Sequence, residues 1–266
     1  IMSRRPSSSL LISTYNAPLQ LELVLRSALA QTTLPDEILI ADDGSTDETR
    51  TLVETIKRES PIPLIHVWHE DKGFRKSIIL NKAISKAAGD YLIQVDGDCI
   101  LHPALIQDHL RFAHVGYYQF GTRIRIPQKM VPELLQKKCI HFGCRSPYPK
   151  KTIRLIRFPN VTLLQKPVKF GVKKFRGCNA SFWKSDIQAI NGYNEAMKGW
   201  GCEDSELIIR LQNKGIKGRR LRYCGLVYHI DHPIACKKAT SDNQLIEQEA
   251  IDNKLVTCTL GLNQYP

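Results

Sequence analysis

Short apolar runs and helical patterns alternate along the N-terminal part of the chain. The apolar runs have the length of buried strands and lie at 9–16, 37–41, 63–68 and 91–95. Helical patterns follow the first three runs, from Pro18 to Leu29, from Asp47 to Arg58 and from Lys76 to Ala87. This order predicts parallel, right-handed βαβ units, and hence an α/β fold with a mostly parallel central sheet flanked by helices.

The later elements are spaced less regularly. The second helix carries a capping signal, because Ser45 or Thr46 can cap it and Glu48 can complete a capping box with Ser45. Beyond the fourth strand we expect two further strands and four helices. The strands are expected at 117–126 and 219–228, and the helices at 131–138, from the cap Ser185 to Gly192, from Glu203 to Gly215, and at 241–256, the last being amphipathic.

Polar clusters follow three of the predicted strands. They are Thr14-Tyr15-Asn16, Asp42-Asp43 and Asp96-Gly97-Asp98. Parallel strands bring their carboxyl ends to one edge of a sheet, which is where open α/β sheets bind ligands. An Asp-x-Asp at that edge suits a divalent cation such as Mn²⁺ or Mg²⁺ that carries a diphosphate, although an Asp-Gly-Asp turn alone could also cap the next helix. The chain has no dinucleotide-binding or P-loop glycine motif, which again favours a metal as the phosphate-binding group.

Composition sets the class of protein. The 266 residues are 42% hydrophobic and 24% charged, which is ordinary for a globular protein. No apolar run is long enough to span a bilayer and no signal-peptide pattern is visible. The eight cysteines show no Cys-x-x-Cys spacing, so we expect reduced thiols and a cytoplasmic location.

The net charge of +12 comes from one segment. Residues 123–176 hold 15 Lys and Arg against one acid, Glu133, and the rest of the chain has 23 basic and 25 acidic residues. This segment predicts a local face for an anionic partner, either the inner face of a membrane, bound peripherally, or an acidic acceptor such as a phosphorylated lipid-linked glycan. The alternative is a solvated lid. A nucleic-acid-binding protein would also fit the segment alone, but the acidic clusters would repel phosphate, so no nucleic acid is expected.

Four motifs together resemble one enzyme family. Ser13-Thr14-Tyr15-Asn16, Asp42-Asp43-Gly44-Ser45, Asp96-Gly97-Asp98 and Glu203-Asp204 occur in the order and spacing of the inverting glycosyltransferases of family 2, which have the nucleotide-diphospho-sugar-transferase (GT-A) fold. Gly199-Trp200-Gly201-Cys202-Glu203-Asp204 with Tyr228-His229 is similar to the C-terminal module of β-1,4-galactosyltransferases and chondroitin-polymerase-type enzymes. The resemblance covers residues 8–122 and 175–262.

The resemblance implies one continuous domain in three parts. Residues 1–122 would be the nucleotide-sugar-binding half, 123–176 a basic variable segment or lid, and 177–266 the acceptor-binding and catalytic half with a C-terminal helix. It further implies a metal-dependent inverting transfer from a nucleotide-diphospho-sugar, and the expected donor is a UDP-sugar such as UDP-galactose or UDP-N-acetylgalactosamine. The acceptor would be a glycan or lipid-linked glycan hydroxyl in polysaccharide or lipopolysaccharide synthesis.

The donor-side residues follow from the matching motif positions. Thr14, Tyr15 and Asp43 would line the nucleotide-base pocket, with Asp42 nearby, and Asp71, Arg75 and Asn81 would also lie on the donor side. Asp96 would face the ribose or a metal-bound water. Asp98 would ligate the metal together with His229, which the resemblance favours over His232, although a lone histidine at a strand end is often structural.

The acceptor-side residues come from the second module. Asp204 would be the general base, Glu203 would hold an acceptor hydroxyl, and Trp200 would form a wall of the acceptor site. These roles are chemically consistent, because inverting transfer needs a carboxylate on the face opposite the leaving group. An alternative for Glu203 and Asp204 is that they are only first-turn acids, favoured by the helix dipole. An alternative function is that of a sugar-phosphate nucleotidyltransferase. Such an enzyme would need a Gly-rich basic loop after the first strand, where this chain has Ser13-Thr14-Tyr15-Asn16.

Overall fold

The computed structural model describes residues 5–143, 146–148, 156–168, 175–232 and 240–265. Its N-terminal half has the predicted alternation of strands and helices. These elements are β1 (Ser8–Thr14), α1 (Pro18–Leu29), β2 (Glu37–Asp42), α2 (Asp47–Glu59), β3 (Leu64–Trp68), α3 (Lys76–Lys86) and β4 (Tyr91–Asp96).

The second half adds shorter elements that complete the sheet and build a second one. They are β5 (Cys99–Leu101), α4 (Leu105–Arg111), β6 (Tyr117–Phe120), β7 (Thr122–Ile126), the 3-10 helix η1 (Gln128–Met130), α5 (Val131–Lys137), the 3-10 helix η3 (Pro159–Leu164), β8 (Asn179–Trp183), α6 (Lys184–Ala189), α7 (Glu203–Asn213), β9 (Lys217–Arg220), β10 (Leu226–Ile230), α8 (Thr240–Asp252) and the 3-10 helix η4 (Leu262–Gln264).

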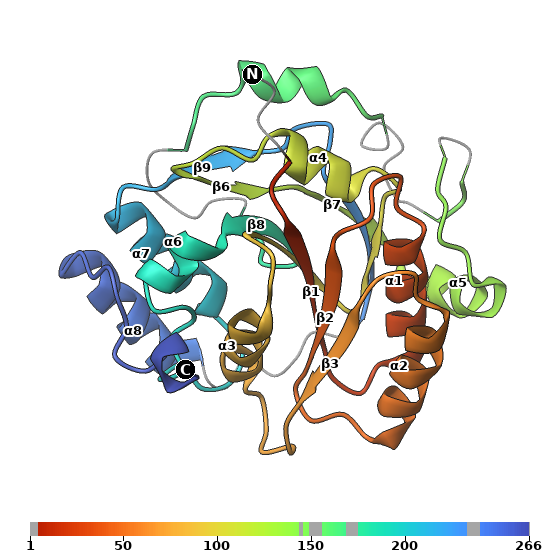
Figure 1. Cartoon of the computed structure of the whole chain (residues 1–266), viewed down its shortest axis with the longest axis horizontal. Coiled ribbons are helices and arrows are strands. Elements are labelled where there is room, and N and C mark those ends of the chain that lie inside the picture. The colour runs from red at the N-terminus through yellow and green to blue at the C-terminus, as the bar shows by residue number, and fades with distance from the viewer. Residues whose placement is uncertain (1–4, 144–145, 149–155, 169–174, 233–239, 266) are drawn as a thin grey trace.

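The central sheet has the strand order β3-β2-β1-β4-β8-β6-β9 (Figure 1). The first four strands are parallel, while β8 runs antiparallel to both of its neighbours. Thr14 pairs with Asp42, Asp42 with Trp68, and Ser13 with Asp96, so the three polar clusters lie side by side at one edge. The predicted α/β class with a mostly parallel sheet is confirmed.

Two long strands of the sequence prediction are wrong, because each is two strands that belong to different sheets. Residues 117–126 divide into β6 and β7, and residues 219–228 divide into β9 and β10; β7 and β10 form a second sheet with β5, in the order β5-β10-β7. The two chain segments cross between sheets at Gly121 and Gly225. A Cβ at Gly121 would overlap the carbonyl oxygen of Gly225, and Gly225 has a φ of +56°, so glycine is needed at the crossing.

Of the predicted helix caps, Thr46 occupies the N-cap position of α2, whereas Ser45 and Ser185 do not cap their helices. α2 begins after Thr46, with no side-chain capping bond, because Ser45 Oγ instead accepts a hydrogen bond from the backbone N–H of Asn16 at 2.8 Å. The Asn16 side chain in turn accepts one from the backbone N–H of Thr46 at 2.9 Å. α6 begins after Trp183, so Ser185 lies inside that helix. The first loop of the chain therefore takes the place of a capping box at the start of α2.

Period-two alternation along the strands supplies two cores. Leu10, Ile12, Ile38 and Ile40 face α1 and α2, whereas Leu11 and its neighbours on that side face α3, α6 and α7. Helices therefore cover both faces of the sheet (Figure 1). None of the helices in the described ranges is both long and apolar enough to cross a membrane.

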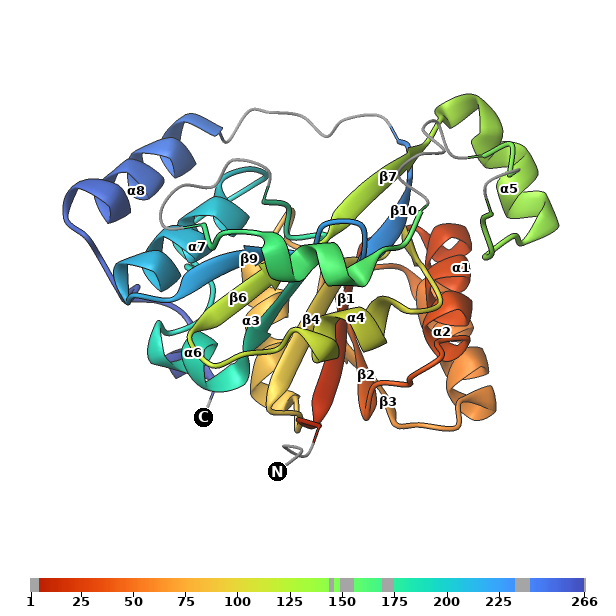
Figure 2. The same cartoon turned by 90° about the horizontal axis from the view of Figure 1, so that it is seen from above.

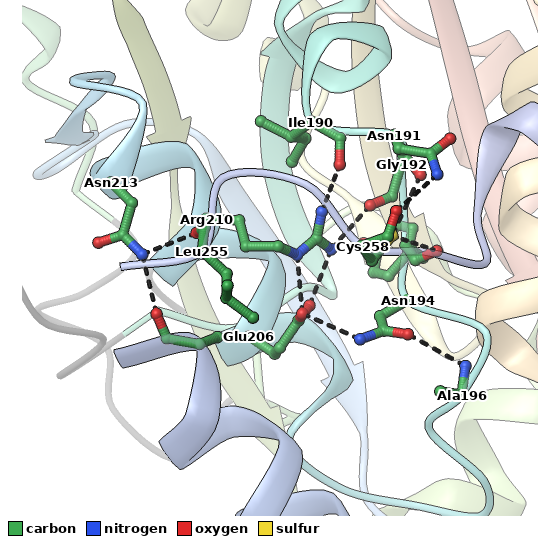
Figure 3. A network of polar contacts seen from close by, with 12 residues as sticks. Ile190, Asn191, Gly192, Asn194, Ala196, Glu206, Arg210, Asn213, Leu255 and Cys258 are labelled. Carbon is green, nitrogen blue, oxygen red and sulfur yellow. Dashed lines mark hydrogen bonds and ion pairs between the residues drawn. The ribbon is translucent and has the colours of Figure 1, made fainter. Parts of the chain in front are cut away.

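A buried ion pair fixes α7 against the loop that follows α6 (Figure 3). The Arg210 guanidinium donates to both carboxylate oxygens of Glu206, at 2.7 and 2.8 Å, and to the carbonyl oxygens of Ile190 and Gly192. Both side chains are at most 1% exposed. These contacts of Arg210 orient α7, the helix whose first turn carries Glu203 and Asp204.

Several described parts of the basic segment 123–176 contact the rest of the fold. β7 belongs to the second sheet, Leu134 of α5 packs in one apolar cluster with Leu23 of α1, and Arg157 pairs with Asp108. The six described cysteines are free thiols, as predicted, while Cys144 and Cys236 lie outside the described residues.

Candidate active site

Three metal-ligating side chains meet at the end of β4. Asp98 Oδ2 lies 3.3 Å from His229 Nε2 and 3.0 Å from His232 Nε2, and one ligand atom from each residue falls within 4.8 Å of the others. The second sheet brings them together, because β10 runs antiparallel to β5 with His229 opposite Cys99 and the Ile230 N–H donating to the Asp98 carbonyl. The resemblance favours His229 over His232 as a metal ligand, and in the structure both lie at Asp98.

This donor set fits a divalent transition metal. One carboxylate and two imidazoles suit Mn²⁺ better than Mg²⁺, which prefers oxygen ligands alone. Burial raises the pKa of Asp98, but hydrogen bonds from His229 and His232 outweigh it and hold that pKa far below its usual range. The carboxylate is therefore ionised and available as a ligand at neutral pH.

We refer to the carboxyl ends of β1, β2 and β4 as the donor edge. At this edge Asp43 contacts both His69 and Arg75. Asp43 Oδ1 lies 2.7 Å from His69 Nε2, and Oδ2 accepts a hydrogen bond from the backbone N–H of Arg75 at 2.8 Å. Burial raises the pKa of Asp43 and lowers that of His69. The Arg75 side chain donates to the Glu70 carbonyl oxygen. These contacts join the end of β2 to the start of α3.

Tyr15 and Asp71 contact each other at the donor edge. Tyr15 is half exposed and its hydroxyl donates to Asp71 Oδ2 at 2.9 Å. Gly44 lies beneath them with a φ of +97°, and a Cβ there would sit 2.6 Å from the Asp71 backbone. Thr14 Oγ1 is buried without a hydrogen-bond partner among the described residues. The loops after β1, β2 and β3 therefore bring four residues together at the donor edge, namely Thr14, Tyr15, Asp43 and Asp71.

Two predicted donor residues take structural positions instead. Asp42 is fully buried, with one oxygen accepting from the Ser45 N–H and the other 2.8 Å from His66 Nε2. Asn81 is also fully buried; its amide donates to Tyr193 O and Glu195 Oε1 and accepts from the Tyr193 N–H. The Asp42 carboxylate therefore holds the loop after β2 at the donor edge itself, and the Asn81 amide joins α3 to the 193–195 loop.

Lys76 lies between the donor edge and α7, and no motif in the sequence points to it. Its Nζ donates to Asp96 Oδ1 at 2.8 Å, an oxygen that also accepts from the Ser13 hydroxyl. Burial lowers the pKa of Lys76, but attraction to Asp96, Asp204 and Glu203 outweighs it and raises that pKa well above its usual value. Lys76 is therefore a fixed cation among three carboxylates.

Asp204 has the properties of a poised base. Its Oδ2 accepts a hydrogen bond from the backbone N–H of Gly177 at 3.1 Å, while its Oδ1 is buried without a partner among the described residues. Burial, with repulsion from Glu203 and Asp96, raises the pKa of Asp204 to about 7 despite the opposing charge of Lys76. A free carboxylate oxygen with a pKa near neutrality is suited to accepting a proton from a substrate hydroxyl.

Glycines place Asp204 and the residues before it. A Cβ at Gly177 would overlap the Asp204 carboxylate. The loop before α7 has positive φ values at Gly199, Gly201 and Cys202, namely 72°, 115° and 69°. Glu203 is buried and accepts from the Gly201 N–H, and Trp200 is 38% exposed at the loop surface.

Two successive hydrogen bonds, which the sequence does not predict, hold the backbone of Gly177. The Tyr193 hydroxyl donates to Gln94 Oε1 at 2.9 Å, and Gln94 Nε2 donates to the Gly177 carbonyl oxygen at 3.1 Å. Gln94 looks like one more residue of a buried strand in the sequence. Its role follows only from the antiparallel pairing of β4 with β8, which begins two residues after Gly177.

Family models match most of the chain. The model of glycosyl transferase family 2 matches residues 9–177, and the model described as the N-terminal domain of galactosyltransferase matches residues 159–233. The first spans the donor edge and Asp98, and the second spans Glu203, Asp204, His229 and His232.

Curated relatives cover much of the chain at moderate identity. Validoxylamine A glucosyltransferase from Streptomyces hygroscopicus subsp. limoneus is 29% identical over 228 residues, which are 80% of this chain and 49% of the relative. Chondroitin synthase from Pasteurella multocida is 32% identical over 251 residues, which are 85% of this chain and 25% of the relative. The chain thus spans about half of the first relative and a quarter of the second.

Solved structures share the fold. S. aureus TarS 1-349 in complex with UDP-GlcNAc superposes with a TM-score of 0.66 at 14% identity, covering 97% of this chain and 69% of that one. Mannosyltransferase PcManGT from Pyrobaculum calidifontis, in complex with GDP-Man and Mn²⁺, gives 0.58 at 18% identity, covering 85% and 57%. At these identities the likeness concerns the GT-A fold alone.

Proposed function

The chain belongs to glycosyl transferase family 2, and on that premise we propose that it transfers a sugar from a nucleotide-diphospho-sugar to a glycan hydroxyl with inversion. The observation that carries the proposal is Asp204, whose Oδ1 is buried without a partner among the described residues and whose pKa is raised to about 7. Lys76, which pairs with Asp96 at the donor edge, is the cation that acts on this carboxylate. The family match favours this reaction over a nucleotidyltransferase or a nucleic-acid-binding protein.

The donor is proposed to bind along the edge formed by β1, β2 and β4. Thr14, Tyr15, Asp43 and Asp71 would receive the base, and Asp96 would face the ribose. Arg75 stays in this group, because its backbone N–H holds Asp43 and its Nε is buried without a partner among the described residues. A UDP-sugar is the proposed donor, supported by the likeness of the fold to a structure that holds UDP-GlcNAc.

Asp98, His229 and His232 would hold a divalent ion, Mn²⁺ by preference. When bound, such an ion supplies positive charge that stabilises the departing diphosphate. The protein's part is to keep Asp98 ionised and the two imidazoles turned toward it, which the β5–β10 pairing does.

The transfer step needs no covalent sugar–enzyme intermediate. The acceptor oxygen attacks C1, the bond from C1 to the diphosphate oxygen breaks with its electron pair leaving on the nucleotide, and Asp204 takes the acceptor proton. Glu203 and Trp200 would position the acceptor, Glu203 by accepting from a second hydroxyl and Trp200 by packing on the sugar face. Lys76 keeps enough positive charge nearby for Asp204 to be ionised near neutral pH.

We also propose a donor sugar and a class of acceptor. Similarity to chondroitin synthase and to a galactosyltransferase domain supports polysaccharide or lipopolysaccharide synthesis with UDP-galactose or UDP-N-acetylgalactosamine as donor. These relatives extend beyond the length of this chain, so the acceptor is proposed only as a glycan or lipid-linked glycan hydroxyl.

The test measures nucleotide release from a panel of UDP-, GDP- and dTDP-sugars, with Mn²⁺ or with EDTA. Turnover of one donor that EDTA abolishes is expected for the wild type, and loss of that turnover for Asp98→Ala and Asp204→Asn. Asp252→Ala, an exposed change on α8, should keep full activity. Metal-independent turnover, or an Asp204→Asn variant as active as the wild type, would contradict the proposal.

A further inference from the structure

A second surface of the molecule combines exposed apolar side chains with clustered positive charge. It is formed by the strap 156–168, which contains η3, together with α4 and the turn between β9 and β10 (Figures 1 and 2). We refer to it as the strap surface. It shares no residue with the candidate active site.

The strap is held in place by specific contacts. Arg157 donates to both oxygens of the buried Asp108, at 3.1 Å from Nε to each and at 2.6 Å from Nη2 to Oδ1. The Phe158 N–H donates to the Tyr223 carbonyl oxygen, and Val168 forms a β-bridge with Gly218. The strap is therefore a fixed part of the fold, and its outward side chains are held outward.

Three large apolar side chains of the strap are more than half exposed, and a fourth, Ile156, is 39% exposed. Phe158 is 60% exposed, Leu163 68% and Leu164 80%. Thr162, next to the two leucines, is buried and donates to the Arg222 carbonyl oxygen at 3.2 Å. Because Thr162 faces the protein, the polar residue is inside and the apolar ones are outside, which is the reverse of a soluble surface.

Positive charge surrounds these apolar side chains. The stretches 105–120, 156–168 and 217–225 contain seven Lys and Arg residues, namely Arg111, Arg157, Lys166, Lys217, Arg219, Arg220 and Arg222, and a single acid, the buried Asp108. Arg111 donates to Asn160 of η3 at 2.6 Å, and Arg219 donates to the Phe112 carbonyl, so the stretches adjoin one another. The strap surface therefore presents cations without exposed acids of its own.

We propose that the strap surface docks on an anionic lipid bilayer, with Phe158, Leu163 and Leu164 entering the interface and the surrounding cations contacting lipid phosphates. A soluble polyanion would engage the charges but leave three large apolar side chains in water, whereas a bilayer satisfies both. Of the basic segment 123–176, only the strap 156–168 belongs to the proposed membrane-binding surface. Residues of α4 and β9, which lie outside that segment in the sequence, also belong to it. It stands independently of the reaction at the active site.

The test is co-sedimentation of the protein with vesicles of phosphatidylcholine, with or without phosphatidylglycerol. The wild type should bind the anionic vesicles and lose most of that binding in high salt. Leu163→Ser/Leu164→Ser and Lys166→Glu/Arg222→Glu should each lower the partition coefficient at least tenfold. The matched controls are Leu245→Ser, another leucine that is 71% exposed, and Lys57→Glu/Lys86→Glu, a charge reversal on other helices; both should bind as the wild type does.

Two results would overturn the proposal. One is a wild type that stays in the supernatant with anionic vesicles at low salt. The other is vesicle binding that needs the cations but not the leucines, with equal retention of the leucine variant on heparin, which would identify a soluble polyanion site. Donor turnover and thermal unfolding of each variant, expected to match the wild type, show that the fold and the active site are intact.

Discussion

Lys76 Nζ lies 2.8 Å from Asp96 Oδ1, and this ion pair joins the two halves of the candidate site. Asp96 ends β4 at the donor edge, while Lys76 also attracts Asp204 and Glu203 of α7. Without the lysine, three carboxylates would face one another with no cation among them.

Lys76→Met is therefore expected to lower kcat/KM at pH 7 at least tenfold. Loss of the cation raises the pKa of Asp204 further, so the rise of activity with pH should move to higher pH. Lys76→Arg should recover part of the activity and return the profile toward that of the wild type. Lys86→Met, an exposed change on the same helix, is the control. A profile that does not move in Lys76→Met would mean that the lysine has only a packing role.

The pH dependence of wild-type activity should follow Asp204. A base must be ionised, so kcat/KM should rise with pH through about 7, the raised pKa of this carboxyl group. A limb centred near pH 4 would show that some other, unperturbed carboxylate is the base.

The same raised pKa predicts a stability effect. The folded protein binds the Asp204 proton more tightly than the unfolded chain does, so this group's stabilising contribution is present at low pH and is lost as pH rises from about 4 to about 7. Asp204→Asn removes that loss, and its Tm should exceed the wild type's by more at pH 8 than at pH 4.5. Equal Tm differences at the two pH values would contradict a raised pKa.

Mn²⁺ affinity should depend on all three side chains of the cluster. Asp98→Ala, His229→Ala and His232→Ala are each expected to weaken Mn²⁺ binding at least tenfold, as measured by calorimetry, while His114→Ala, at an exposed site elsewhere, should not. Retention of full affinity in His232→Ala would leave Asp98 and His229 as the only protein ligands.

Gly177→Ala tests the position of the base. The new methyl group would overlap the Asp204 carboxylate, which is the end of a flexible side chain and can turn away, so the fold should survive and kcat should fall at least tenfold. Gly143→Ala, where a Cβ meets nothing within 4 Å among the described residues, is the matched control. Full activity of Gly177→Ala would show that Asp204 need not occupy the position seen here.

Arg210→Met should destabilise the fold by about 3–5 kcal/mol, because it leaves the buried Glu206 carboxylate without its partner. Chemical denaturation measures the change, with Arg58→Met on the exposed face of α2 as the control. The double variant Arg210→Met/Glu206→Leu should regain part of the loss. A single variant that costs less than about 1 kcal/mol would mean that water reaches Glu206.

The sequence by itself determined the features that depend on local pattern. Alternating apolar runs and helical periods sufficed for the βαβ order, and the parallel register then put Thr14, Asp42 and Asp96 at one edge without any further information. The four motifs, read as a resemblance, pointed to family 2, which the family match confirms.

Only the tertiary structure decided which side chains meet across elements. His232 reaches Asp98 because β10 and β5 pair in a second sheet, and Lys76 reaches Asp96 because α3 begins beside the end of β4. Asn81 is turned to the 193–195 loop, although its sequence position matches a donor residue. The exposure of the strap leucines is likewise visible only in the structure. Period and spacing describe neighbours along the chain, whereas these relationships depend on long-range packing that no local pattern encodes.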